Sequence, residues 1–201
     1  LFREYIAQLM EYDKKFLVIG NTNAITYKEI FPLIKDNKMW QGVNKGSFTF
    51  ELPDDTSSTS YYIDDQDGKK KQKFGNITWW TNLEYPRRKQ DIILFREYEG
   101  NEDKYPKYDN YDAINVDKVA EIPKDYKGVI GVPITFIGQW NPEQFEVLGL
   151  CSSAGYDKEI VGIDMIGEGD ARPILDGNVK YSRIFIKQKD SNGKWITLNY
   201  Y

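Results

Sequence analysis

The side chains that could carry chemistry in this sequence are mostly amides, aromatic rings and basic groups. The chain has no histidine and one cysteine, Cys151, which excludes Ser-His-Asp and Cys-His catalysis and every zinc site that needs histidine. The acidic residues 64–68 lack the closing glutamate of a calcium loop. Gly167 and Gly169 form an isolated Gly-x-Gly that is more typical of a turn than of a phosphate-binding loop. We therefore expect no metal centre.

Two adjacent tryptophans make the most distinctive predicted strand, and a basic triplet, Arg87-Arg88-Lys89, follows it within a few residues. Trp79 and Trp80 are adjacent within residues 74–83, which are predicted to form a strand, so their side chains should point to opposite faces. One ring can lie in the core while the other is covered or binds something; the alternative is that both pack. The lysine-rich residues 69–73 are either a solvated face or a patch that faces phosphate.

The N-terminal elements predict half of an open α/β sheet. Apolar spacing indicates an amphipathic helix over residues 1–12, and the continuous apolar run of residues 15–20 indicates an interior strand of a parallel sheet. Asn21 and Asn23 follow this strand, where ligands bind in such sheets, although a simple turn is an equal alternative. A capping-box pattern at residues 26–29 predicts a second helix. Because Pro32 would fall inside it, this helix should be short, be kinked or begin later.

The remainder of the chain is predicted to be strand-rich and irregular. The tyrosine-rich residues 97–115 should be an irregular segment outside the core, and Pro133 indicates a sheet edge or a break. Asn141 and Pro142 resemble a helix N-terminus. Further strands are expected at residues 39–52, 61–63, 91–95, 128–136, 145–150 (strand or short helix) and 181–187, with a hairpin turn at 192–193 before residues 194–198.

Length and composition set broad limits. The chain has 201 residues, 40% of them apolar, and a net charge of −4, which suits one large or two small domains and excludes collagen-like and wholly disordered classes. No run of about 18 apolar residues is present, so we expect no membrane contact. The lone cysteine and the lack of a visible secretory signal favour a cytoplasmic location.

Several strings of this sequence resemble the EcoRI-type adenine-specific DNA methyltransferase family. They occur in the family's order, with a compatible tail near Arg172 and Arg183. The strings are LFREYI at residues 1–6, FLVIGN at 16–21, AITYKEI at 24–30, GNITWWTNL at 75–83, YPKYDNYDAI at 105–114 and GVPITF at 131–136.

The resemblance implies methyl transfer from S-adenosylmethionine to N6 of an adenine flipped out of double-stranded DNA. In the family an Asn-Pro-Pro-Phe loop holds the amino group, and it lies just ahead of the helix that resembles residues 1–12. This sequence contains neither that tetrapeptide nor a glycine-rich cofactor loop. We therefore expect the catalytic loop before Leu1, an upstream portion of the same protein as partner, and no activity in the chain alone.

The resemblance also implies an α/β fold. In it, this chain contributes the later strands of a Rossmann-like methyltransferase sheet and therefore contains only part of that sheet. Residues 1–96 would be the C-terminal half of that domain, and residues 97–201 an irregular, β-rich region for DNA target recognition. One tryptophan could stack on the flipped base, and the basic triplet could contact phosphate, or simply be solvated. The expected DNA-binding residues are Asn21, Asn23, Trp79, Trp80, Asn82, Arg87, Arg88 and Lys89.

Two other functions remain open from the sequence. The chain could be a non-catalytic DNA-binding module that retains only half of the sheet. The density of tyrosine and tryptophan could instead indicate an aromatic-rich carbohydrate- or peptide-binding domain.

Overall fold

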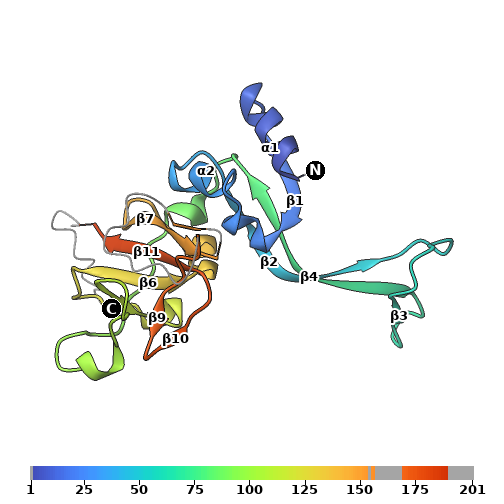
Figure 1. The fold of residues 1–201 in the computed structure, drawn as a ribbon. Helices are drawn as coiled ribbons and strands as arrows, with labels where there is room; N and C mark the ends of the chain where they lie inside the picture. Colours follow the sequence, from blue (N-terminus) through green and yellow to red (C-terminus); the bar gives the residue numbers. More distant parts are fainter. Residues whose placement is uncertain (1, 154, 157–168, 190–201) are drawn as a thin grey trace, which may run out of the picture. The chain divides into compact units, whose positions relative to one another are not determined.

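The computed structural model describes residues 2–153, 155–156 and 169–189. The chain divides into two compact units, Leu1–Glu84 and Tyr85–Tyr201, and Figure 1 shows the elements of each. The expected hairpin at residues 192–198 lies outside the described residues.

The first unit begins with the predicted amphipathic helix, α1 (Phe2–Glu11). Its Ile6 is fully buried, and the ring of Phe2 lies 6.3 Å from that of Trp80, centroid to centroid. Gly20 permits this approach, because a Cβ there would lie 2.5 Å from the Phe2 ring and 2.8 Å from the Trp80 ring. The helix is therefore fixed to the sheet through its first turn.

The sheet of the first unit is antiparallel throughout its described pairs. Its order is β1-β4-β2, and β3 pairs with β4. The predicted strands at residues 39–52, 61–63 and 74–83 are confirmed, although the last begins earlier than expected. The bounds are β1 Leu17–Asn21, β2 Trp40–Glu51, β3 Tyr62–Ile63 and β4 Lys70–Thr81.

The prediction of an interior parallel strand at residues 15–20 is wrong for the described chain. β1 forms there, but it pairs only with β4 among the described strands, and it does so in the antiparallel direction. Leu17 and Ile19 on one of its faces are 55% and 47% exposed. The apolar run predicted burial on both faces, whereas the described residues cover only one.

The connection from β1 to β2 contains two short helices. These are the 3-10 helix η1 (Thr22–Thr26) and α2 (Phe31–Lys35), which has Pro32 in its first turn. The later start that the proline allowed is therefore confirmed. The capping box does not form, because Thr26 donates its hydroxyl to the carbonyl of Asn23 and α2 begins only at Phe31.

The second unit is built on a five-stranded sheet of order β5-β6-β11-β7-β8. β5 and β6 are parallel and the other pairs are antiparallel. The strands predicted at residues 145–150 and 181–187 are confirmed. The strand predicted at residues 128–136 is confirmed only as far as Pro133, which ends β6, because residues 134–136 belong to the 3-10 helix η5 (Ile134–Gln139). The bounds are β5 Ala113–Asn115, β6 Val129–Pro133, β7 Phe145–Ser152, β8 Gly155–Tyr156 and β11 Arg183–Gln188.

Short elements complete the second unit. Two strands form a separate antiparallel pair, β9 (Ile174–Leu175) with β10 (Asn178–Val179). Besides η5, three 3-10 helices lie in the described connections: η2 (Pro86–Lys89), η3 (Glu102–Lys104) and η4 (Val119–Glu121).

Two local predictions in the second unit are wrong. Residues 91–95 form no strand; the side-chain amide of Gln144 binds the backbone N–H and C=O of Ile92 at 2.7 and 2.8 Å instead. Residues 141–145 form no helix, because Asn141 accepts the N–H of Glu143 in a turn and donates to the Asp91 carboxylate at 2.8 Å. In both places a side-chain amide supplies the hydrogen bonds that a regular element would have supplied.

The tyrosine-rich residues 97–115 are irregular, as predicted, except for η3 and for β5 at their end, but they are not outside the core. Tyr105, Tyr108 and Tyr111 are each at least 93% buried. Tyr108 and Tyr111 pack on the ring of Phe185 from β11, with centroid distances of 5.8 and 4.8 Å. The hydroxyl of Tyr111 donates to the carbonyl of Ala171 at 2.6 Å. Aromatic rings therefore supply the core here, and their hydroxyls are satisfied by local acceptors.

Candidate nucleic-acid interface

Two of the three asparagines predicted to bind DNA lie where β1 ends: Asn21 is its last residue, and Asn23 follows in η1. The side chain of Asn21 caps η1 by accepting the N–H of Asn23 at 2.7 Å. The backbone carbonyl of Asn21 also accepts the indole N–H of Trp80 at 3.3 Å. Asn21 is thus engaged in the turn, whereas the side chain of Asn23 is exposed and accessible to a ligand.

The two tryptophans do point to opposite faces of β4. Trp80 is fully buried beside Phe2. Trp79 is half-buried and lies on the other face of the sheet. Its cross-strand partner there is Ile19 of β1, which is 47% exposed. Of the pair, only Trp79 presents ring surface to a ligand.

Asn82 lies just beyond the end of β4 and is engaged with the chain that enters β1. Its Oδ1 accepts the N–H of Phe16 at 3.0 Å, and its Nδ2 donates to the carbonyl of Lys14 at 2.9 Å. Both ends of the amide are used, so the geometry gives Asn82 a positioning role.

The basic triplet belongs to the second unit, where it forms most of η2. Arg88 is 6% exposed, whereas Arg87 and Lys89 are exposed. Arg87 and Lys89 can therefore contact phosphate from this short helix, and Arg88 contributes to packing.

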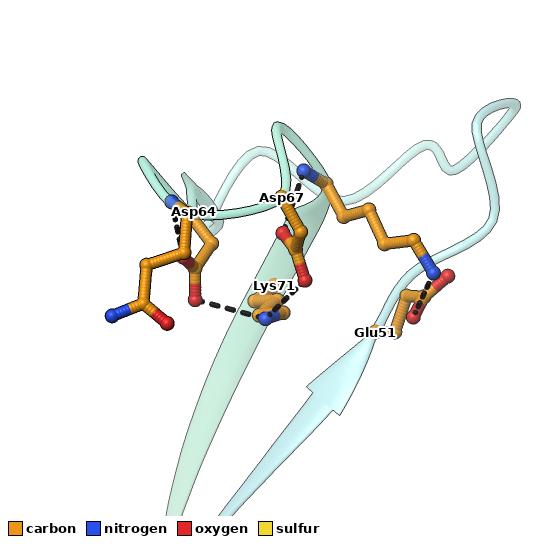
Figure 2. Close-up of polar contacts among 6 residues, drawn as sticks. Glu51, Asp64, Asp67 and Lys71 are labelled. Carbon is orange, nitrogen blue, oxygen red and sulfur yellow. Dashed lines mark hydrogen bonds and ion pairs between the residues drawn. The ribbon is translucent and has the colours of Figure 1, made fainter.

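Two of the four lysines in residues 69–73, Lys69 and Lys71, are paired with acids, and Figure 2 shows these pairs. Lys71 contacts the carboxylates of Asp64 and Asp67 at 2.8 and 2.7 Å, and Lys69 contacts Glu51 at 2.9 Å. Hydrogen bonds from Lys71 hold the pKa of both aspartates below the usual range, and they raise the pKa of Lys71 in return. This pairing favours the solvated-face interpretation over a phosphate-facing patch.

The same ribbon of β2 and β4 carries an aromatic face that the sequence analysis did not identify. Phe48, Phe50 and Phe74 lie together, with centroid distances of 6.2 Å from Phe48 to Phe50 and 5.7 Å from Phe50 to Phe74. Phe50 and Phe74 are 38% and 37% exposed. The alternation of Phe48, Phe50 and Leu52 was the available signal for this face.

Comparison with known proteins identifies the family. Residues 1–189 match the sequence profile described as "Adenine-specific methyltransferase EcoRI". The chain belongs to the EcoRI adenine-specific methyltransferase family. The resemblance seen in the sequence strings is thus confirmed over nearly the whole chain.

Three relatives show how much of an EcoRI-type methyltransferase this chain spans. Type II methyltransferase M.EcoRI of Escherichia coli is 47% identical over 193 residues, which are 94% of this chain and 55% of that protein. Type II methyltransferases M.MpnI of Mycoplasma pneumoniae and M.MgeORF184P of Mycoplasma genitalium are 36% and 35% identical over 95% and 94% of this chain. The chain spans 62% of the length of each Mycoplasma protein. No solved structure matches it.

Neither a metal-binding cluster nor a membrane-spanning helix is present in the described ranges. No group of three or more Cys, Asp or Glu side chains there could hold a metal ion. No helix among those residues has the length and apolar character needed to cross a membrane.

Proposed function

We propose that this chain is the C-terminal part of an S-adenosylmethionine-dependent DNA methyltransferase that modifies N6 of adenine in double-stranded DNA. The family match over residues 1–189 carries the proposal. The chain spans 55–62% of its relatives and contains no Asn-Pro-Pro-Phe sequence. We therefore assign the catalytic loop to a portion upstream of Leu1, and we expect the chain alone to be inactive.

The sheet of the first unit supports a place at the end of a Rossmann-like methyltransferase sheet. β1 and β2 are both antiparallel to β4, so they run parallel to each other. An antiparallel strand near the edge of an otherwise parallel sheet is common in doubly wound folds. Leu17 and Ile19 of β1 are half exposed. We propose that the upstream portion of the same protein covers these two side chains and contributes a parallel strand beside β1.

The DNA-facing residues divide by their burial. We propose that Trp79 stacks on a base and that Arg87 and Lys89 contact phosphates, because these side chains are accessible. Asn23 is accessible as well, and we keep it in the interface. Trp80, Arg88, Asn82 and Asn21 support the interface from within, through the packing and hydrogen bonds described above.

S-adenosylmethionine supplies the methyl group in the proposed reaction. In the described residues β1 leads through Asn21 directly into the five-residue η1, and no glycine-rich turn lies between them. The residues present do not fit a cofactor loop, and we assign cofactor binding to the upstream portion. The contribution of this chain is to bind and orient DNA.

The burial of the tyrosines weakens the carbohydrate- or peptide-binding alternative. That alternative rested on aromatic density, and Tyr105, Tyr108 and Tyr111 belong to the core. Their rings are therefore not available as a sugar-stacking surface.

The proposed function is tested by measuring transfer of labelled methyl groups from S-adenosylmethionine to double-stranded DNA. The complete reading frame should produce N6-methyladenine, and the 201-residue chain should not. In the complete protein, Trp79→Ala should lower the rate at least tenfold, whereas Tyr181→Ala, which removes an exposed ring from the second unit, should leave it within twofold. Absence of N6-methyladenine from the complete protein, or activity of the chain alone, would contradict the proposal.

A further inference from the structure

The second unit contains a cavity of about 710 Å³ that no part of the proposed function uses. It is lined by the segment that follows η2, by the end of β5, and by residues that follow β5. Its polar lining includes Arg96, Lys104 and Asn115, and its ring surfaces come from Phe95 and Tyr105.

Asn115 presents a fixed hydrogen-bond donor to this cavity. Asn115 is one of the lining residues although it is only 5% exposed. Its Oδ1 accepts the hydroxyl of Tyr108 at 2.7 Å, a shorter bond than the one from the same hydroxyl to the carbonyl of Gly131 at 3.3 Å. Because the tyrosine hydroxyl donates in this shorter bond, Oδ1 is the end of the amide that faces Tyr108. Nδ2 of Asn115, for which the described residues provide no partner, is the donor available to a ligand.

The charged side chains of the cavity lining are three carboxylates and two basic groups, Arg96 and Lys104. Its three carboxylates are paired with basic side chains: Glu97 with Lys124 at 2.6 Å, Asp117 with Arg183 at 2.7 Å and Glu121 with Lys118 at 3.2 Å. Lys104 donates to the neutral amide oxygen of Asn101 at 2.6 Å. No carboxylate pairs with Arg96 in the described part of the chain. Arg96 and Lys104 are thus the charged lining groups that have no ionic partner among the described residues, and they favour an anionic ligand.

The aromatic wall favours a planar group next to that anion. Phe95 lines the cavity while 77% of the residue is exposed, so one ring face is open to stacking. Tyr105 is 7% exposed, and its hydroxyl donates to the backbone carbonyl of Glu121 at 3.1 Å. Its ring is thereby held as a rigid wall.

We propose that this cavity binds a nucleotide, with the phosphate oxygens accepting hydrogen bonds from Arg96, Lys104 and Nδ2 of Asn115, and the base stacking on Phe95. An anion joined to a flat ring matches the donors and the aromatic face. The choice of a nucleotide among phosphorylated ring compounds rests on the proposed function. A free mononucleotide and a nucleotide within a DNA strand share this chemistry.

Calorimetric titration of the 201-residue chain with four probes tests the proposal: thymidine 5′-monophosphate, thymidine, inorganic phosphate and a ten-residue oligothymidylate. The monophosphate should bind at least tenfold more tightly than thymidine or phosphate. Arg96→Gln and Asn115→Asp should each weaken its binding about tenfold or more, because each removes a hydrogen bond to a charged group. Asn115→Asp retains the oxygen that Tyr108 needs. Lys187→Gln, an exposed change on β11 outside the cavity lining, is the matched control and should change binding less than twofold.

The oligothymidylate distinguishes the two sources of the nucleotide. Binding with the same dependence on Arg96 and Asn115 would assign the site to a DNA strand, and binding of the monophosphate alone would assign it to a free nucleotide. The proposal is overturned if neither thymidine 5′-monophosphate nor the oligothymidylate binds. It is also overturned if the Arg96→Gln chain is folded and binds the monophosphate as tightly as the unchanged chain does. The Asn115 side-chain NH₂ signals in a ¹H–¹⁵N spectrum should also shift on binding. If the complete protein methylates adenine but the cavity binds none of the probes, the nucleotide site is wrong and the proposed function stands. If the cavity binds the nucleotide but the complete protein does not methylate adenine, the proposed function is wrong and the nucleotide site stands.

Discussion

The side-chain amide of Asn82 holds the backbone of Phe16, 66 residues earlier in the chain. Its Oδ1 accepts the Phe16 N–H at 3.0 Å, while its Nδ2 donates to the carbonyl of Lys14 at 2.9 Å. The hydroxyl of Thr81 adds a bond of 2.6 Å to the carbonyl of Phe16. The end of β4 thus fixes the chain where it enters β1, and with it the position of Asn21 and Asn23.

Replacing Asn82 with alanine should therefore lower stability. Asn82→Ala leaves the Phe16 N–H and the Lys14 carbonyl without this partner, and should reduce the free energy of unfolding by about 1–3 kcal/mol. Urea denaturation followed by tryptophan fluorescence measures the change. Asn23→Ala, at an exposed side chain, should stay within about 0.5 kcal/mol. Equal effects of the two substitutions would refute the positioning role of Asn82.

Local patterns predicted the elements whose signals lie within a few residues. The apolar spacing from Phe2 to Met10 gave α1, and the alternation around Ile184 gave β11, because each pattern repeats with the period of its element. Pro133 was informative for the same reason, since its missing N–H ends β6 locally.

The failures involve partners that are distant in sequence. Residues 91–95 have strand-like composition, yet Gln144, about 50 positions later, satisfies Ile92 with a side chain. Tyr108 and Tyr111 lie in a polar segment, yet they reach the core through Phe185 of β11. β1 carries an apolar run whose second face no described residue covers, so sequence alone could not show which face is exposed.

For the candidate site, the sequence indicated which residues lie there, but it did not show which of them are exposed to a ligand and which are buried. It placed Trp79 and Trp80 on opposite faces, because adjacent strand residues must alternate. Which of the two is buried depends on α1, through Phe2 and the space left by Gly20. The basic triplet has the same limitation, because burial of Arg88 between two exposed neighbours depends on the tertiary environment of η2.

The ion pairs of Lys71 should be visible in the titration of two aspartates. The pKa of Asp64 and of Asp67 is lowered chiefly by the hydrogen bond from Lys71, and next by a backbone N–H. A folded-state pKa below the unfolded value means that the pairs stabilise the turn above about pH 3.9 and that this support is lost as the pH falls through the folded pKa. In the Lys71→Gln variant, the ¹³C carboxyl titrations of both aspartates should move to higher pH.

Lys69→Gln is the matched control for this titration. It removes the pair with Glu51, which does not involve Asp64, so the midpoint of Asp64 should not move. If the midpoints of Asp64 and Asp67 are the same with and without Lys71, the pairing shown in Figure 2 does not persist in solution.

The exposed members of the basic triplet should show their phosphate contacts in the salt dependence of DNA binding. Each contact with duplex phosphate contributes about 0.9 to the slope of log K against log salt concentration. In the complete protein, Arg87→Gln should reduce that slope by about this amount, whereas Lys187→Gln should leave it unchanged. Arg88→Gln, at a buried side chain, should lower the urea midpoint and preserve the slope. Fluorescence anisotropy between 50 and 200 mM salt measures this slope. If the slope is unchanged in both Arg87→Gln and Lys89→Gln, η2 is not part of the DNA interface, because a basic side chain that contacts phosphate must release a counterion.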